Sequence, residues 1–202
     1  MAEARPAAWL IVGINGAGKT TFYEEFLRPR LSAEFVNADE IARARWGESA
    51  AAHVYEAGRL AEVRRRELIG QRASFVAETV FSHPSKLDLV RDLCTAGYRV
   101  QLFYIHVPLK LAQRRITTRV ALGGHDVPAE KIRSRYPGVI AGLLAAIPLV
   151  ERAYLYDNSR ADRLHRHVMT FADGRLVRLV RDPPRWVGQL FPRLRSSTRG
   201  RK

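Results

Sequence analysis

Short apolar runs alternate with longer segments of helical period over most of the chain. We expect buried β-strands at five of these runs, because each is short and is bounded by turn signals or by a helical pattern: Trp9–Val12, Phe35–Asn37, Phe75–Glu78, Val100–Val107 and Tyr154–Asp157. The segments between the runs predict helices over Thr20–Leu27, His53–Gln71, Pro84–Ala96, Leu109–Val120 and Ala129–Leu144. Alternating strands and helices indicate an α/β protein with three layers, in which helices cover both faces of a mostly parallel five-stranded sheet.

The pattern changes after the fifth run. Asp173-Gly174 lies between two alternating runs, which predicts a small C-terminal β-hairpin at about 166–181. The basic, polar residues 192–202 are typical of a flexible, solvated tail. We therefore expect one domain over residues 1–191, followed by the tail, which suits a length of 202 residues.

The composition is strongly basic. The 34 Lys and Arg against 20 Asp and Glu give a net charge of +14, and residues 152–202 carry much of this excess. Most of the basic residues are Arg, whose planar fork suits phosphate and carboxylate groups. Anionic partners are therefore expected, and composition is compatible with nucleotides, nucleic acid or an acidic protein.

The single cysteine, Cys94, permits no intrachain disulfide and gives no sign of an oxidising compartment. The longest apolar stretch, Val139 to Val150, is interrupted by Gly142 and Pro148 and is too short to span a bilayer. We expect a cytoplasmic protein without a membrane segment.

The strongest motif directly follows the first expected strand. Gly13-Ile-Asn-Gly-Ala-Gly-Lys-Thr matches the P-loop pattern G-x-x-x-x-G-K-[ST] with a strand before it and a helix after it. The glycines allow backbone N–H groups to form an anion nest at a helix N-terminus, Lys19 would reach the β- and γ-phosphates of ATP, and Thr20 would hold Mg²⁺. The expected nucleotide-binding residues are Gly13, Asn15, Gly16, Ala17, Gly18, Lys19, Thr20 and Thr21.

The rest of the chain narrows the class of P-loop protein. It contains neither the N-K-x-D nor the D-x-x-G motif of GTPases, and AAA-type or helicase motors are normally longer. A small phosphotransferase remains, in which catalysis is mainly positioning and charge neutralisation. We therefore expect a P-loop kinase fold.

Acidic residues follow two of the other strands, at the edge where ligands bind in open α/β sheets. Asp39 is the candidate general base for an acceptor hydroxyl, unless it only caps the next helix. Glu78, followed by Thr79, is either a magnesium partner or a hydrogen-bond acceptor for substrate, unless it is an ordinary strand end.

Arginines on two successive helices predict a lid. Arg115 and Arg119 lie four residues apart, a repulsive spacing unless an anion lies between them. After a Gly-Gly turn, the next helix carries Arg133 and Arg135. Together they predict a lid that closes on the transferring phosphate, with solvated helix faces as the alternative.

Two histidines near the predicted hairpin carry little chemistry. His165 and His167 would share one face of a strand, with no cysteine or third histidine nearby. We therefore interpret both as surface residues rather than metal ligands.

At about residues 9–159 the sequence resembles the zeta toxins of bacterial toxin–antitoxin systems, P-loop kinases related to UDP-N-acetylglucosamine kinase. The resemblance rests on the following segments: Gly13-Ile-Asn-Gly-Ala-Gly-Lys-Thr-Thr-Phe, Phe35-Val-Asn-Ala-Asp, Ala77-Glu-Thr, Gly97-Tyr-Arg-Val, Arg119-Val with Gly123-Gly-His-Asp-Val-Pro, and Tyr156-Asp-Asn-Ser. Their combination is specific, although most single pieces are not.

The resemblance implies ATP-dependent phosphorylation of the 3′-hydroxyl of the amino sugar in a UDP-sugar, and an antitoxin protein as partner. It assigns ATP and Mg²⁺ to Lys19 and Thr20, the base to Asp39, UDP-sugar contacts to Glu78 and Thr79, and a phosphate contact to Arg119. Counting from Arg119 places the second lid arginine at Arg133, whereas matching the Val-Pro turn places His125 there. Asp157 and Asn158 would lie near the adenine.

The chain departs from the family at its C-terminal end. It has a hairpin and a basic tail where some members have a long extension. UDP-N-acetylglucosamine is the first acceptor that the resemblance implies, and the C-terminal departure concerns the part of the chain that could form the substrate wall. The alternatives are a kinase of another small hydroxyl compound, such as a nucleoside or an antibiotic, and a nucleotide-gated nucleic-acid-binding module that uses the basic C-terminus.

Overall fold

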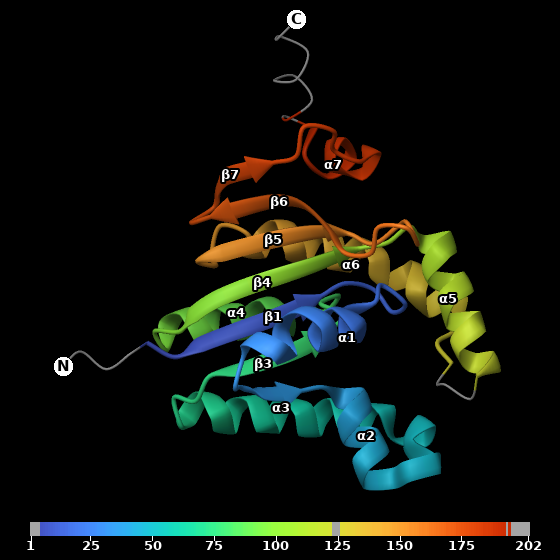
Figure 1. The fold of residues 1–202 in the computed structure, drawn as a ribbon. Coiled ribbons are helices and arrows are strands. Elements are labelled where there is room, and N and C mark those ends of the chain that lie inside the picture. The colour runs from blue at the N-terminus through green and yellow to red at the C-terminus, as the bar shows by residue number, and fades with distance from the viewer. Residues whose placement is uncertain (1–4, 123–125, 193, 195–202) are drawn as a thin grey trace, which may run out of the picture.

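The computed structural model describes residues 5–122, 126–192 and 194, which fold around one β-sheet (Figure 1). Its strands, in the order β2-β3-β1-β4-β5-β6-β7 across the sheet, are β1 (Ala7–Val12), β2 (Glu34–Val36), β3 (Phe75–Thr79), β4 (Arg99–His106), β5 (Arg152–Asp157), β6 (Arg166–Ala172) and β7 (Arg175–Leu179). The first five pair in parallel, and β6 and β7 add to them as an antiparallel hairpin. The expected α/β P-loop kinase fold is confirmed.

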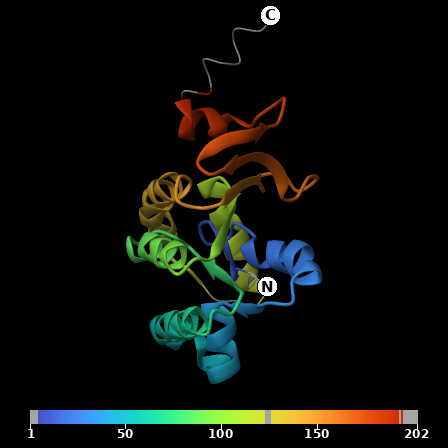
Figure 2. The ribbon, with the colours of Figure 1, turned by 90° about the vertical axis from the view of Figure 1, so that its left-hand side faces the viewer.

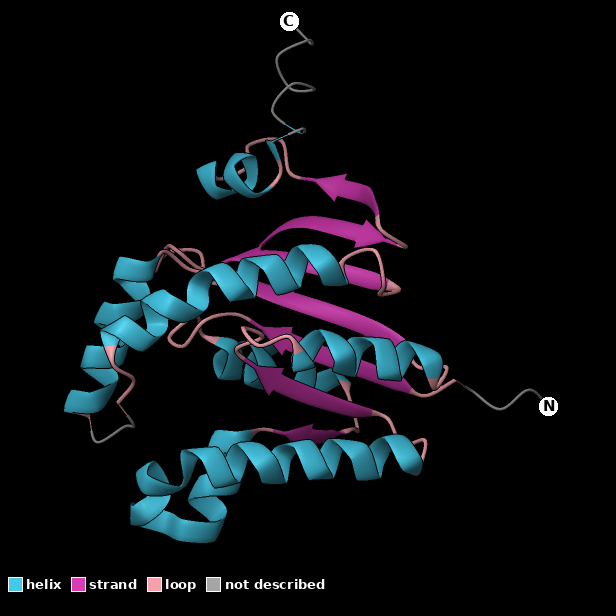
Figure 3. Ribbon diagram, turned by 180° about the vertical axis from the view of Figure 1, so that it is seen from behind, coloured by secondary structure: helices cyan, strands magenta, loops and turns pink. Residues whose placement is uncertain are grey.

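Helices cover both faces of the sheet, which is seen from its edge in Figure 2. They are α1 (Lys19–Phe22), the π-helix η1 (Tyr23–Leu27), the 3₁₀-helix η2 (Arg28–Arg30), α2 (Ala38–Trp46), the 3₁₀-helix η3 (Gly47–His53), α3 (Val54–Gly70), α4 (Ser85–Thr95), α5 (Leu109–Ala121), α6 (Ala129–Ala146) and α7 (Arg185–Leu190). Figure 3 shows α3, α4 and α6 across one face, whereas α1 lies on the other. The expected three layers are therefore present, and α7 is an element that periodicity did not predict.

The central strands β1 and β4 explain why the apolar runs are continuous. Leu10, Ile11 and Val12 of β1 and Leu102 of β4 are completely buried, on whichever face their side chains lie. A strand covered on both faces has no solvent side, so its sequence does not alternate. Among the described residues, no helix is long and apolar enough to cross a membrane.

The C-terminal hairpin is part of the same sheet rather than an appendage. Strand β6 pairs with β5 over most of its length, and α7 then packs Trp186 on His106 at the end of β4, with ring centroids 4.5 Å apart. The Trp186 indole also donates a hydrogen bond to Asp157 Oδ1 at 3.2 Å. The last described segment thus completes the core beside the carboxyl ends of β4 and β5. Most of the predicted tail lies outside the described residues.

His106 makes folding sensitive to acid. It is buried, and burial lowers its pKa to about 4, from an ordinary value of 6.5. The unfolded chain therefore takes up a proton at a higher pH than the folded chain, and the free energy of unfolding falls as the pH drops through this interval. At pH 5 the loss from this residue amounts to about 2 kcal/mol.

We expect the variant His106→Gln to lose less stability than the wild type between pH 7 and pH 5, by about 2 kcal/mol. The measurement is urea unfolding of both proteins at the two pH values. Equal acid sensitivity would show that His106 is protonated in the folded state as readily as in the unfolded one.

Candidate functional site

The P-loop connects β1 to α1 at the carboxyl edge of the sheet and is packed tightly against its neighbours. Gly16 has a φ of +78°, and a Cβ at this position would lie 2.6 Å from the carbonyl oxygen of Ala112 in α5. A side chain at Gly16 would therefore push the loop away from α5. The close approach fixes the loop beside the helix that carries Arg115 and Arg119.

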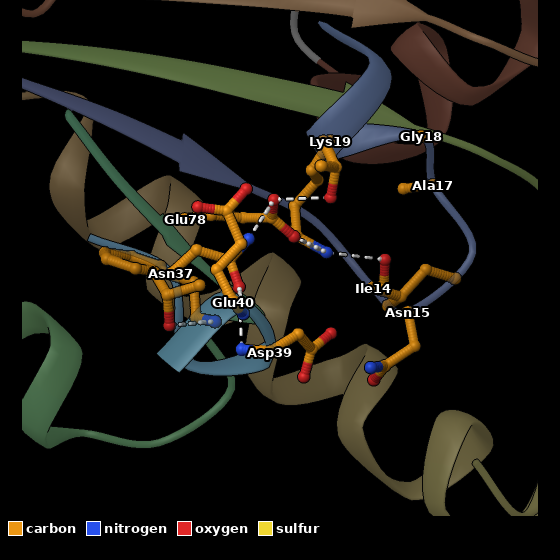
Figure 4. Close-up of polar contacts among 12 residues, drawn as sticks. Ile14, Asn15, Ala17, Gly18, Lys19, Asn37, Asp39, Glu40 and Glu78 are labelled. Carbon is orange, nitrogen blue, oxygen red and sulfur yellow. Dashed lines mark hydrogen bonds and ion pairs between the residues drawn. The ribbon is translucent and has the colours of Figure 1, made fainter. Parts of the chain in front are cut away.

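Glu78, at the end of β3, lies at the start of α1. Its Oε2 accepts a hydrogen bond from Thr20 Oγ1 at 2.8 Å, and its Oε1 lies 3.5 Å from Lys19 Nζ (Figure 4). Lys19 also donates to the carbonyl oxygen of Ile14 at 3.2 Å and is only 6% exposed. Of the two roles considered for Glu78, this placement favours the magnesium partner over the substrate contact.

The donor atoms beside Lys19 suit Mg²⁺. Thr20 offers a hydroxyl and Glu78 a carboxylate, and Mg²⁺ prefers oxygen ligands, usually one or two from the protein together with substrate phosphates and water. Within the described part of the chain, no group of three His, Cys, Asp or Glu residues could hold a metal by itself. The residues thus fit an ion that arrives with a nucleotide.

Asn37 forms hydrogen bonds both with the Glu78 carboxylate and with the backbone of Asp39. It was not identified from the sequence as a site residue. Its Nδ2 donates to Glu78 Oε2 at 2.9 Å, and its Oδ1 accepts from the backbone N–H of Asp39 at 2.7 Å and of Glu40 at 3.3 Å. Asn37 is therefore the N-cap of α2, and the alternative that Asp39 is the cap is wrong. The Asp39 carboxylate points away from Asn37 in Figure 4. The only sequence signal was an Asn two positions before the candidate base.

A cavity of about 900 Å³ opens beside the P-loop. It brings together Thr20, the candidate base Asp39 and the lid residue Arg119. The remaining lining residues come from α2, η3, the start of α3 and the segment before α6, namely Ala42, Arg43, Gly47, Glu48, Ala50, Ala51, Val54 and Asp126. Three candidates from distant parts of the sequence therefore share one space.

The second helix of the predicted lid contacts the P-loop through a different arginine from the one expected. Arg133 is 64% exposed and lies 3.7 Å from Glu130, whereas Arg135 donates from its guanidinium to Asn15 Oδ1 at 3.1 Å. Two residues along a helix turn the side chain by roughly 200°, so these arginines face opposite ways. The structure does not bring Arg133 to the loop. The turn with Gly123, Gly124 and His125, and thus the alternative at His125, lies outside the described residues.

The side chains of the two residues expected near the adenine form hydrogen bonds with other residues of the protein. Asp157 is 4% exposed and accepts hydrogen bonds from Trp186 and Ser159. Asn158 is 3% exposed, and its Nδ2 donates to the Ala17 carbonyl oxygen at 2.8 Å. These side chains therefore face the interior of the protein. Both residues lie at the end of β5, next to the P-loop, where other protein groups are within hydrogen-bond distance.

The remaining candidates differ in their surroundings. Arg115 turns from α5 toward Asn158, whose carbonyl oxygen accepts its hydrogen bond at 3.0 Å, and burial lowers the pKa of this guanidinium. Thr79 lies partly buried at the end of β3, and Thr21 is exposed on α1. His165 corrects the interpretation as a surface residue, because it is only 4% exposed and contacts Gly18 of the P-loop.

The double role of Asn37 can be separated by substitution. We expect Asn37→Asp to weaken Mg-ATP binding about tenfold, because the carboxylate that replaces the amide repels Glu78 and moves it away from Thr20 and Lys19. The cap acceptor remains, so the free energy of unfolding should fall only through the contact between the two carboxylates, by about 1–3 kcal/mol. Titration calorimetry and urea unfolding provide the two measurements.

Asn37→Ser is the matched control for the cap, since its hydroxyl can still accept from the helix N-terminus. Unchanged Mg-ATP affinity in Asn37→Asp would contradict the link between Asn37 and the nucleotide site.

Solved structures share this fold at low sequence identity. The chain matches a crystal structure of AvrRxo1-ORF1:AvrRxo1-ORF2 with sulphate ions at 18% identity and a TM-score of 0.68, covering 96% of this chain and 64% of that one. The PezAT chromosomal toxin–antitoxin system of Streptococcus pneumoniae matches at 18% identity and a TM-score of 0.55, covering 77% and 68%. A putative kinase from Chloroflexus aurantiacus matches at 18% identity and a TM-score of 0.59, covering 79% and 92%. The chain thus spans less than two thirds of the matched chain in the AvrRxo1 complex, and these likenesses concern the fold.

No curated protein matches the sequence. A family profile, described as AAA domain, matches residues 9–135, which is more than half of the chain and includes the P-loop, Asp39, Glu78 and all three arginines of α5. AAA-type motors were excluded from the sequence because they are normally longer than this chain. The profile describes a domain and not a whole motor protein, so the match is compatible with this exclusion. The chain belongs to the AAA domain family AAA_33, and it has a P-loop kinase fold.

Proposed function

We propose that this protein is an ATP-dependent kinase that transfers the γ-phosphoryl group to a sugar hydroxyl, the 3′-hydroxyl of a UDP-activated amino sugar such as UDP-N-acetylglucosamine. The observation that carries the proposal is the shared cavity, where Thr20 at the phosphate end, Asp39 and Arg119 line one space. A phosphoryl transfer needs this combination, because donor phosphates, base and acceptor must meet within a few ångströms.

The residues have distinct roles in the proposed reaction. Asp39 accepts the proton of the acceptor hydroxyl while the hydroxyl oxygen forms a bond to the γ-phosphorus. The bond from that phosphorus to the bridging oxygen of ADP breaks at the same time. Lys19 and Arg119 bring positive charge to the transferring group. Mg²⁺, held by Thr20 and Glu78 with the nucleotide, would neutralise charge on the phosphate oxygens.

The lining of the cavity supports a nucleotide sugar as acceptor. Small residues on α2 and η3 leave room, and about 900 Å³ lies within the usual range for small-molecule sites. Arg43 gives the wall a cation for a diphosphate, and Glu48 and Asp126 offer acceptors for hydroxyl and amide groups.

The carboxylates also support the second candidate, a kinase of another small hydroxyl compound. Asp39, Glu48 and Asp126 together would favour a polyhydroxyl or amine-bearing acceptor such as a nucleoside or an antibiotic.

The proteins of similar fold include a toxin–antitoxin system and a two-chain AvrRxo1 complex. An antitoxin-like partner protein for this chain is part of the proposal.

Mass spectrometry of the reaction products tests the acceptor. We expect Mg-ATP and a panel of UDP-sugars, nucleosides and antibiotics to yield one product, an amino-sugar nucleotide that has gained one phosphate. Lys19→Ala should abolish this product, because it removes the cation at the phosphates. A phosphorylated nucleoside or antibiotic would support the second candidate, and ATP left intact would favour a nucleotide-gated nucleic-acid-binding module.

The base assignment has its own test. Asp39→Asn should lower kcat by about 10²–10⁴-fold, since the amide cannot take the proton, while Mg-ATP affinity stays unchanged. Asp126→Asn is the matched control, a carboxylate of the same cavity that should alter KM for the acceptor more than kcat. Full activity of Asp39→Asn would remove Asp39 from the role of base.

A further inference from the structure

Two side chains from beyond β5 hold two consecutive carbonyl groups at the back of the P-loop. Asn158 Nδ2 donates to the Ala17 carbonyl oxygen at 2.8 Å, and His165 Nε2 lies 3.0 Å from the Gly18 carbonyl oxygen. Both side chains are almost completely buried. They lie outside residues 9–135, so the family pattern does not include these contacts.

The contact with Gly18 requires one tautomer of His165. A carbonyl oxygen only accepts, so this hydrogen bond forms when Nε2 carries the ring hydrogen. The Asn158 amide nitrogen, 3.2 Å from the same Nε2, is also a donor and therefore directs its hydrogen to Ala17. His165 Nδ1 is left bare and buried, without a hydrogen-bond partner among the described residues, and 3.9 Å from the Glu25 carboxylate.

The surroundings keep this ring neutral and in place. Burial lowers the pKa of His165 below its ordinary value of 6.5. The rings of Phe22 and Phe26 meet the imidazole edge-on at centroid distances of 5.4 and 5.6 Å. The backbone of His165 has a φ of +47°, an uncommon conformation for a residue with a side chain, which persists where the surroundings enforce it.

The hydrogen bonds to these two carbonyl groups also determine the directions of two backbone N–H groups, those of Gly18 and Lys19. A trans peptide is planar, and its N–H points opposite to its C=O. Fixing the Ala17 oxygen at the back therefore turns the N–H of Gly18 to the other side of the loop, and fixing the Gly18 oxygen does the same for Lys19. These are two of the N–H groups from which a P-loop forms its anion nest.

The contacts explain why residue 18 must be a glycine. Gly18 has a φ of +87°, and a Cβ there would lie 2.5 Å from Asn158 Nδ2. Its carbonyl oxygen also accepts the first hydrogen bond of α1, from Phe22 N at 3.0 Å. The Gly18 oxygen is thus held by the helix and by His165 together.

We propose that His165, acting through Gly18 and in concert with Asn158, is a positioning residue that orients the N–H groups of the P-loop for nucleotide phosphates. The inference deepens the proposed function and rests on it, because the oriented groups must receive ATP. It predicts that the donor hydrogen of His165, rather than the bulk of its ring, determines affinity for the nucleotide.

The test compares four proteins by calorimetric titration with Mg-ATP, at a temperature where thermal unfolding shows each to be folded. His165→Leu keeps bulk and loses the donor, and we expect about tenfold weaker binding. His165→Gln carries an amide donor at a similar reach and should bind within about twofold of the wild type. His167→Leu is the matched control, because His167 contacts Met169 and Thr170 rather than the P-loop.

The outcomes separate the inference from the proposed function. Equal Mg-ATP affinity in wild type and His165→Leu, or an equal loss in the Leu and Gln variants, overturns the positioning role. A wild type that binds no Mg-ATP overturns the proposed function and this inference together. If His165→Leu does not fold, His165→Asn replaces it, since Asn tolerates a positive φ but its shorter amide does not reach Gly18.

Discussion

Glu78 accepts hydrogen bonds from Thr20 and Asn37 and lies 3.5 Å from Lys19, so one carboxylate connects β3 to both sides of the candidate site. A largely buried carboxylate is stable only with such partners. Because Asn37 also caps α2, the same network determines where the helix that carries Asp39 and lines the cavity begins. One set of hydrogen bonds therefore positions both the start of α1 and the start of α2.

The sheet makes this arrangement possible. Five parallel strands end at one edge, so the P-loop after β1, Asn37 after β2, Glu78 in β3 and Asn158 after β5 converge although they are far apart in sequence. The helices add the rest, since α5 and α6 carry the arginines that reach the cavity and the P-loop. The polar residues of the candidate site lie at this edge because all the parallel strands have their carboxyl ends there.

The C-terminal part of the chain supports the site from behind. Strands β6 and β7 widen the sheet, Trp186 of α7 covers His106, and His165 with Asn158 contacts the back of the P-loop. Residues outside the lining of the cavity thus hold the backbone of the P-loop. Buried hydrogen bonds therefore join the P-loop directly to the C-terminal segment of the chain.

Local patterns in the sequence determined the parts of the protein that depend on neighbours along the chain. The apolar runs predicted the five parallel strands, Asp173-Gly174 predicted the hairpin, and the glycines with Lys19 and Thr20 predicted the P-loop, because strand burial, turn geometry and an anion nest each need particular residues at fixed spacing. Other features depend on contacts between distant segments, and only the tertiary structure decided them. It placed Arg135 instead of Arg133 at Asn15, assigned the helix cap to Asn37, and buried His165 against Gly18. Which face of a helix meets a loop, and which polar group finds a buried partner, is determined by packing across the sheet, which spacing along the chain does not encode.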